Sequence, residues 1–108
     1  MNGFLGLDTS NYTTSVAFCT QSGEVLQEKH LLPVKAGEMG LRQSDAVFHH
    51  VRQLPEMTEK LFAREAFTVT AVAASDRPQQ KDGSYMPCFL VGAGAARELG
   101  ALLHIPVH

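Results

Sequence analysis

A polar turn between two β-prone runs near the N-terminus constrains this chain more than any other segment. The runs cover residues 4–8 and 14–20, and the turn between them is rich in hydroxyl side chains. Such residues favour turns because their side chains hydrogen-bond to nearby backbone groups. The exposed amides and hydroxyls of a turn can hold a phosphate, although a polar hairpin needs no ligand. The candidate contacts are Asp8, Thr9, Ser10 and Asn11.

Hydrophobic periodicity predicts three consecutive strands at the start of the chain. β-prone runs cover residues 4–8, 14–20 and 24–31, and a short turn ending in Gly23 joins the last two. A glycine at that position supplies the positive φ that a tight hairpin needs. We therefore expect an antiparallel meander.

An amphipathic helix is expected to follow a surface loop over residues 32–43. An apolar stripe with spacings of three and four predicts the helix over residues 44–62. Its members are Val47, Val51, Leu54, Met57, Leu61 and Phe62. Ser44 or Asp45 provides an N-cap for it. Pro55 lies inside the pattern and removes one backbone hydrogen bond, so we expect it to kink or split the helix.

The remaining segments predict a buried parallel strand at 68–75, an Ala- and Gly-rich helix at 86–103 and the start of a strand at 105–107. The order β-β-β-α-β-α-β resembles one lobe of the α/β ribonuclease-H-like fold of actin-like ATPases. The sheet is then mixed, and ligands gather beyond the carboxyl ends of its strands, where Asp8 and the loop from Ser75 lie. We expect residues 1–108 to form a single lobe of a longer protein.

Composition limits the function classes. A net charge of −2 disfavours strong nucleic-acid binding by this chain alone. No apolar run approaches the roughly 20 residues that span a bilayer, and the start lacks the features of a signal peptide, so we expect a cytoplasmic protein without membrane contact. Cys19 and Cys88 each lie in an apolar run, which favours buried free thiols.

Four segments, in the right order, resemble motifs of one family. They are G-L-D-T-S at 6–10 with T-S-V-A at 14–17, H-V-R-Q-L-P at 50–55, S-D-R-P at 75–78 and L-H-I-P at 103–106. The family patterns are G-I-E-T-S-C-D-D-T, H-x-x-x-L-P, T-R-G-P-G and L-G-I-P. This chain thus resembles the N-terminal lobe of the glycoprotease-like proteins, the O-sialoglycoprotein endopeptidases of peptidase family M22, which act in tRNA threonylcarbamoyladenosine biosynthesis.

The resemblance implies a parent protein that transfers a threonylcarbamoyl group to tRNA with the help of ATP, Mg²⁺ and a divalent metal. Asp8 would then orient water around Mg²⁺, and Thr9, Ser10 and Asn11 would face the phosphates. The family's metal histidines follow the I-P strand, so we expect no metal ligand within this chain. The family's second lobe supplies most of the nucleotide pocket, so we expect this lobe alone to be inactive.

Departures from the family pattern indicate a divergent paralogue. Tyr12 and Thr13 replace two aspartates, and residues 77–83 form a longer, more polar segment than R-G-P-G. The alternative function is therefore a non-catalytic pairing module. It would form a homodimer or heterodimer through the helices around residues 47–62 and 89–103.

Two further features have structural explanations. His50 lies on or beside the apolar stripe of the first helix, where a packed, hydrogen-bonded histidine is favoured over a metal ligand. Gly92, Ala96 and Gly100 recur every fourth residue and make a bare helix face that another element can approach closely, within this chain or in a partner.

Overall fold

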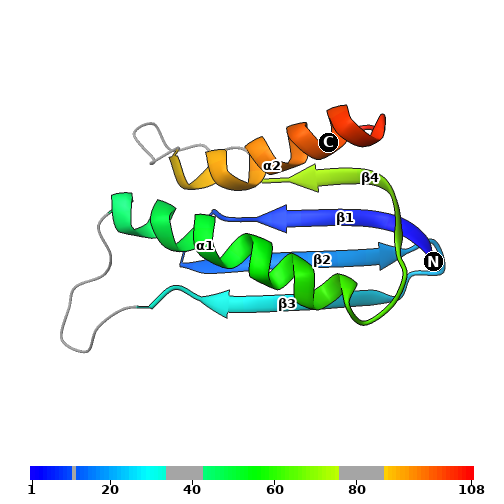
Figure 1. The fold of residues 1–108 in the computed structure, drawn as a ribbon, viewed down its shortest axis with the longest axis horizontal. Coiled ribbons are helices and arrows are strands. Elements are labelled where there is room, and N and C mark those ends of the chain that lie inside the picture. The colour runs from blue at the N-terminus through cyan, green and yellow to red at the C-terminus, as the bar shows by residue number, and fades with distance from the viewer. Residues whose placement is uncertain (11, 34–42, 76–86) are drawn as a thin grey trace.

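Two layers make up the fold in the computed structural model, which describes residues 1–10, 12–33, 43–75 and 87–108 (Figure 1). One layer is a four-stranded sheet whose strands are β1 (Asn2–Asp8), β2 (Thr13–Thr20), β3 (Val25–Leu31) and β4 (Thr68–Ala74). The other layer is formed by α1 (Gln43–Phe62) and α2 (Pro87–Leu103), which both cover the same face of the sheet.

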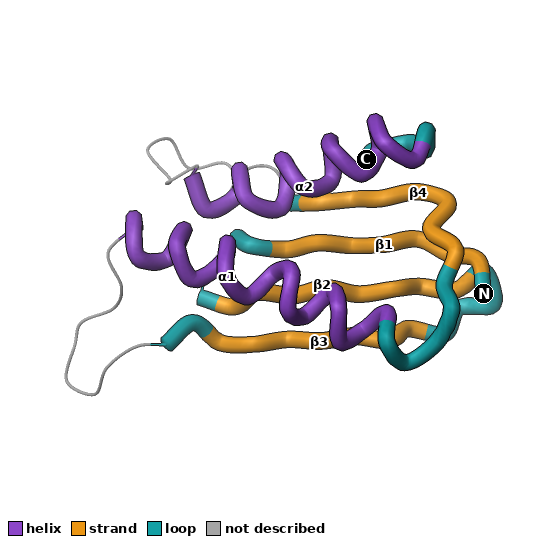
Figure 2. The backbone as a smooth tube through the Cα atoms, in the orientation of Figure 1, coloured by secondary structure: helices purple, strands orange, loops and turns teal. Residues whose placement is uncertain are grey.

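The strand order β3-β2-β1-β4 confirms the predicted mixed sheet (Figure 2). β2 is antiparallel to both β1 and β3, as a meander requires, and β4 runs parallel to β1. Gly23 has a φ of 95° at the β2–β3 turn, as expected. The predicted strand at 105–107 is present as a single parallel bridge between Val72 and Val107.

Alternation along β1 separates a buried face from an open face. Leu5 and Leu7 are buried under the helices, whereas Phe4 and Asp8 are exposed. Successive side chains of a strand point to opposite faces, so Asp8 lies on the face that the helices leave uncovered. The core on the covered face includes Val16, Phe18, Met57, Leu61 and Val72.

Helix α1 differs from its prediction in two respects. It is one continuous 20-residue helix across Pro55, so the expected split is wrong. Pro55 is exposed, and the buried stripe that contains Leu54 and Met57 packs on both sides of it, which offsets the lost backbone bond. Val51 is also not part of the stripe, because 54% of its surface is exposed.

Helix α2 packs closely through its small residues, within the chain. Gly92, Ala96 and Gly100 are all buried. A Cβ at Gly100 would collide with the Val107 side chain, so glycine lets the end of the chain approach the helix. Among the described residues, no helix combines the length and apolar character needed to cross a membrane.

A prediction concerns His104, which ends α2 with a φ of 55°. The Ile105 amide donates to the Gly100 carbonyl at 3.1 Å, so His104 occupies the C′ position, just after the C-cap, at which helices prefer glycine. The family motif has glycine there. We expect His104→Gly to raise the free energy of unfolding by about 1 kcal/mol, because an L-residue is strained in this region.

Urea denaturation measures this change. His104→Ala serves as the control, because it removes the imidazole and keeps the backbone strain. A gain of equal size in His104→Ala, or no gain in His104→Gly, would contradict the strain argument.

Candidate functional site

Asp8 and Ser75 meet at one rim of the sheet. The Ser75 hydroxyl donates to Asp8 Oδ1 at 2.8 Å, and the Ser75 amide donates to the Leu7 carbonyl at 3.3 Å. The two segments are 67 residues apart in the chain. The expectation that the polar turn and the loop after β4 share a rim is therefore confirmed.

The Asp8 carboxylate is held in place by a local turn. The Ser10 amide donates to Asp8 Oδ1 at 2.8 Å, which closes an Asx-turn across Thr9. Partial desolvation raises the pKa of Asp8, but hydrogen bonds from Ser10 and Ser75 and the nearby His50 outweigh it and hold the pKa below its ordinary value. Asp8 is therefore an ionised carboxylate at neutral pH.

Thr9 faces the helices instead of the rim. Its side chain is fully buried, and its hydroxyl donates to the Cys88 carbonyl at 2.5 Å and accepts from the Gly92 amide at 3.0 Å. A hydroxyl has one hydrogen to donate, and this one is used inside the protein. Only the backbone of Thr9 is therefore available to contact a ligand. Its role in binding stays a prediction.

The other two candidates differ in position. Ser10 is half-buried and continues the turn after Thr9. Asn11 lies outside the residues that the structure describes. The expected contact of Ser10 and Asn11 with a ligand stays a prediction.

A shallow pocket of about 370 Å³ lies beside Asp8 on the uncovered face of the sheet. Its polar wall contains Ser15, Gln27 and Ser75, and the Gln27 amide donates to the Ser15 hydroxyl at 3.1 Å. Glycine and alanine residues, together with Leu7, form the rest of the wall. A Cβ at Gly6 would have one neighbour within 4 Å, the Ala17 carbonyl oxygen at 4.0 Å, so glycine leaves open space there.

Sequence analysis missed Ser15 and Gln27. Ser15 was detectable, because the strand alternation that places Asp8 on the open face also applies to β2. Gln27 depends on the pairing of Ala17 with Gln27, which no local pattern encodes. The described lining carries one carboxylate and no lysine or arginine.

His50 is packed and hydrogen-bonded, as predicted. Its side chain is fully buried, and its Nδ1 atom lies 2.8 Å from the Thr14 hydroxyl oxygen. The Gln53 amide donates to the same hydroxyl at 2.9 Å. These bonds join α1 to the start of β2 beneath the polar turn.

The described residues contain no group of three His, Cys, Asp or Glu side chains that could hold a metal ion. His104 and His108 match the letters H-x-x-x-H of the family's metal motif. On a helix this spacing places two imidazoles on one face, but α2 ends at Leu103 and His108 pairs with β4 through its amide. The pair is therefore not a helical metal motif.

The fold is that of a ribonuclease-H-like lobe, the architecture also found in actin-like ATPases, with a polar turn at the carboxyl end of its first strand. YeaZ from Pseudomonas aeruginosa has a TM-score of 0.73 and 23% identity, with 100% of this chain and 43% of that chain covered. An uncharacterized protein with similarity to peptidase YEAZ from Pseudomonas aeruginosa has a TM-score of 0.71 and 23% identity, covering 99% and 42%. These matches show the fold.

A sequence match supports the family resemblance. The tRNA N6-adenosine threonylcarbamoyltransferase of Methanopyrus kandleri is 29% identical over 106 residues, which are 95% of this chain and 29% of the relative. No family model matches the chain. The chain is similar to part of this threonylcarbamoyltransferase, in keeping with the motif resemblance, and it spans less than half the length of the proteins it matches.

The lowered pKa of Asp8 predicts that the stability of the fold depends on pH. Because the pKa of Asp8 is lower in the folded state than in the unfolded chain, the ionised form stabilises the fold. This contribution is complete above the unfolded pKa of about 4 and is lost as the pH falls through the folded pKa. We expect Asp8→Asn to be less stable than the wild type at neutral pH, with a difference that shrinks below about pH 4.

Urea denaturation across this pH range tests the prediction. Glu65→Gln, an exposed carboxylate in the α1–β4 connection, is the matched control. A difference between Asp8→Asn and wild type that stays constant with pH would show that the carboxylate carries no such linkage.

Proposed function

We propose that this chain forms the nucleotide-facing lobe of a threonylcarbamoyl-transfer protein and binds the Mg²⁺-bound phosphates of ATP at the Asp8 turn. The observation that supports the proposal most is the ionised Asp8 beside an open pocket, at the rim that also receives Ser75. The name of the Methanopyrus relative supplies the reaction class.

The residues at the rim fit such a group. A carboxylate is a ligand that Mg²⁺ accepts directly or through its water molecules. The described lining offers no cationic side chain for a bare phosphate, so a phosphate that arrives with its metal suits the charge of the site better. Gly6 leaves space above the sheet for it.

The proposal assigns a role to each candidate residue at the rim. Asp8 orients the water around the cation. The Ser10 hydroxyl turns from Asp8 to a phosphate oxygen, while the Ser10 amide stays bonded to Asp8 and the other turn amides donate to phosphate. Asn11 has the same donor role. Ser75 holds the carboxylate in position. When bound, Mg²⁺ neutralises phosphate charge during acyl transfer.

The complete activity needs more than this lobe. We propose that the lobe is inactive alone, that the longer protein acts on tRNA in the cytoplasm, and that the second lobe completes the nucleotide pocket. We propose that the divalent metal of the family binds in that longer protein, as the family resemblance implies.

Calorimetric titration with Mg-ATP of the longer protein, in which the second lobe completes the pocket, tests the proposal. We expect measurable binding that Asp8→Asn weakens by at least about tenfold, since a charged partner is lost. Glu65→Gln is the control and should bind as the wild type does. Absence of binding at millimolar Mg-ATP, or equal affinity in Asp8→Asn, would contradict the assignment.

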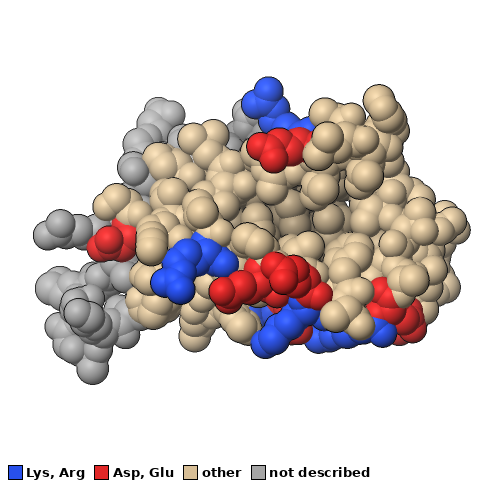
Figure 3. Space-filling view, viewed as in Figure 1, with Lys and Arg blue, Asp and Glu red and all other residues tan. Residues whose placement is uncertain are grey.

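A second candidate function, a pairing module, is favoured by the helical layer. Leu90, Leu102 and Leu103 of α2 are exposed, as are Phe48 and Val51 of α1. Charged side chains gather over α1 and the β3 side, whereas the surface around α2 carries only a small charged cluster (Figure 3). Helices that are apolar around most of their circumference are usually buried, which suits a partner on this face.

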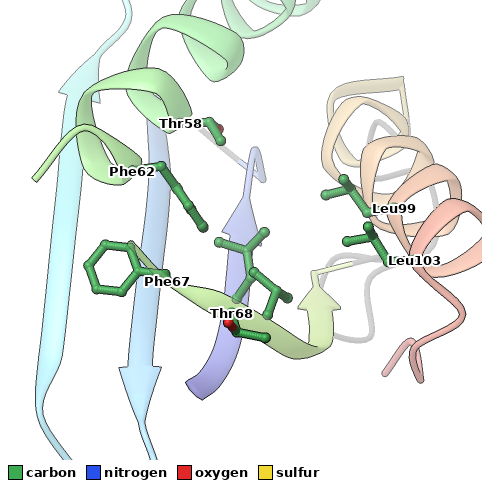
Figure 4. A pocket seen from close by; sticks show the side chains of 8 residues that line it. Thr58, Phe62, Phe67, Thr68, Leu99 and Leu103 are labelled. Carbon is green, nitrogen blue, oxygen red and sulfur yellow. The ribbon is translucent and has the colours of Figure 1, made fainter. Parts of the chain in front are cut away.

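The two helices also leave an apolar groove of about 510 Å³ between them. Leu99 and Leu103 of α2 form one wall, and Phe62 at the end of α1 forms the other (Figure 4). Phe67 and Thr68 form part of its floor. We propose that a homodimer or heterodimer covers this helical face.

Sedimentation velocity distinguishes a pairing module from a monomer. We expect Leu102→Asp to dissociate a dimer and Leu31→Asp, at an equally exposed leucine on β3, to leave it intact, because both side chains are 75% exposed. A strict monomer at high micromolar concentration, alone and with the longer family enzyme, would exclude the pairing module.

A further inference from the structure

The buried Thr9 hydroxyl joins the polar turn to helix α2. It donates to the Cys88 carbonyl at 2.5 Å and accepts from the Gly92 amide at 3.0 Å. Residues four apart are hydrogen-bond partners in an α-helix, so the hydroxyl bridges a carbonyl and an amide of the same helical turn. This bond pair links segments about 80 residues apart in the chain.

The helix side of this contact has no spare room. A Cβ at Gly92 would lie 3.1 Å from Thr9 Oγ1 and 3.8 Å from the Leu7 Cβ atom. The first distance is shorter than an ordinary van der Waals contact, so an alanine would push against the hydroxyl. Gly94, one half-turn further, would meet nothing within 4 Å. The close approach is therefore specific to Gly92.

On the turn side, the contact between Thr9 and α2 lies next to the Asp8 carboxylate in the chain. The hydrogen bond from the Ser10 amide to Asp8 Oδ1 closes a ring whose middle residue is Thr9. Both backbone dihedrals of Thr9 belong to that ring, so a displacement of Thr9 changes the distance between the Ser10 amide and the carboxylate. Asp8 and Thr9 point to opposite faces of the sheet because they are neighbours at the end of a strand.

We propose that Thr9 is a positioning residue whose hydroxyl clamps the first turns of α2 to the end of β1 and thereby sets where the Asp8 carboxylate points. The inference rests on the proposed function only for the statement that this turn is the ligand site. A change in α2 near Gly92 then reaches Asp8 through Thr9. The helical layer and the open face of the sheet are coupled at this residue.

NMR titration of the Asp8 carboxyl carbon tests the proposal from the side of the turn. In Thr9→Val the shape is kept and the hydroxyl is lost, so we expect the pKa of Asp8 to rise toward its ordinary value. Thr9→Ser keeps the hydroxyl and should retain the wild-type titration. Leu61→Ala, a core cavity at the end of α1, controls for lost stability, and it should leave the titration unchanged.

Substitutions on the helix test the same coupling from the other side. We expect Gly92→Ala to raise the pKa of Asp8 and Gly94→Ala to leave it unchanged, although both add one methyl group to α2. Hydrogen exchange of the amides at 88–92 should accelerate about fivefold in Thr9→Val, the factor expected for the net loss of one hydrogen bond.

The outcomes separate this inference from the nucleotide assignment. An unchanged Asp8 titration in both Thr9→Val and Gly92→Ala would overturn the positioning role, whatever the calorimetry shows. An equal shift in Leu61→Ala would do the same, because it would reveal a general effect of lost stability. Absence of Mg-ATP binding with the predicted shifts intact would contradict the proposed function and leave the positioning role supported.

Discussion

The central position of β1, with a different neighbour on each side, is the constraint on which the rest of the structure depends. It pairs antiparallel with β2 and parallel with β4, so each of its backbone edges is used. Its alternation then directs Leu5, Leu7 and Thr9 toward the helices and leaves Asp8 on the open face. A shift of one residue in register would exchange these two sets, which would bury a carboxylate and expose the core.

This division gives the molecule two surfaces with different chemistry. The open face carries the small, polar pocket beside Asp8, where an ionised carboxylate and hydroxyl groups suit a hydrated cation with phosphate. The helical layer carries exposed leucines and an apolar groove, which suit a protein partner. The Thr9 hydroxyl lies where the two layers meet, so the proposed ligand site and the proposed partner surface have a common structural element.

Local patterns were sufficient for most of the fold. Alternation and turn residues predicted the meander, three- and four-residue spacing predicted the first helix, and a long Ala- and Gly-rich apolar run predicted the second, because these signals depend on neighbouring residues only. The expected split at Pro55 and the expected burial of Val51 were wrong. At Pro55 the packing of a long buried stripe outweighs one lost hydrogen bond, and Val51 is apolar without being on the buried face.

The amino-acid sequence alone determined the element order, the family resemblance and the carboxylate at the end of the first strand, since each is carried by contiguous residues. Only the tertiary structure decided which way each polar side chain faces. Thr9 and Ser10 are adjacent and chemically similar, yet the hydroxyl of Thr9 is sequestered by α2. Gln27 lines the pocket because the register between β2 and β3 pairs it with Ala17. Both outcomes depend on contacts between distant segments, which no local sequence pattern specifies.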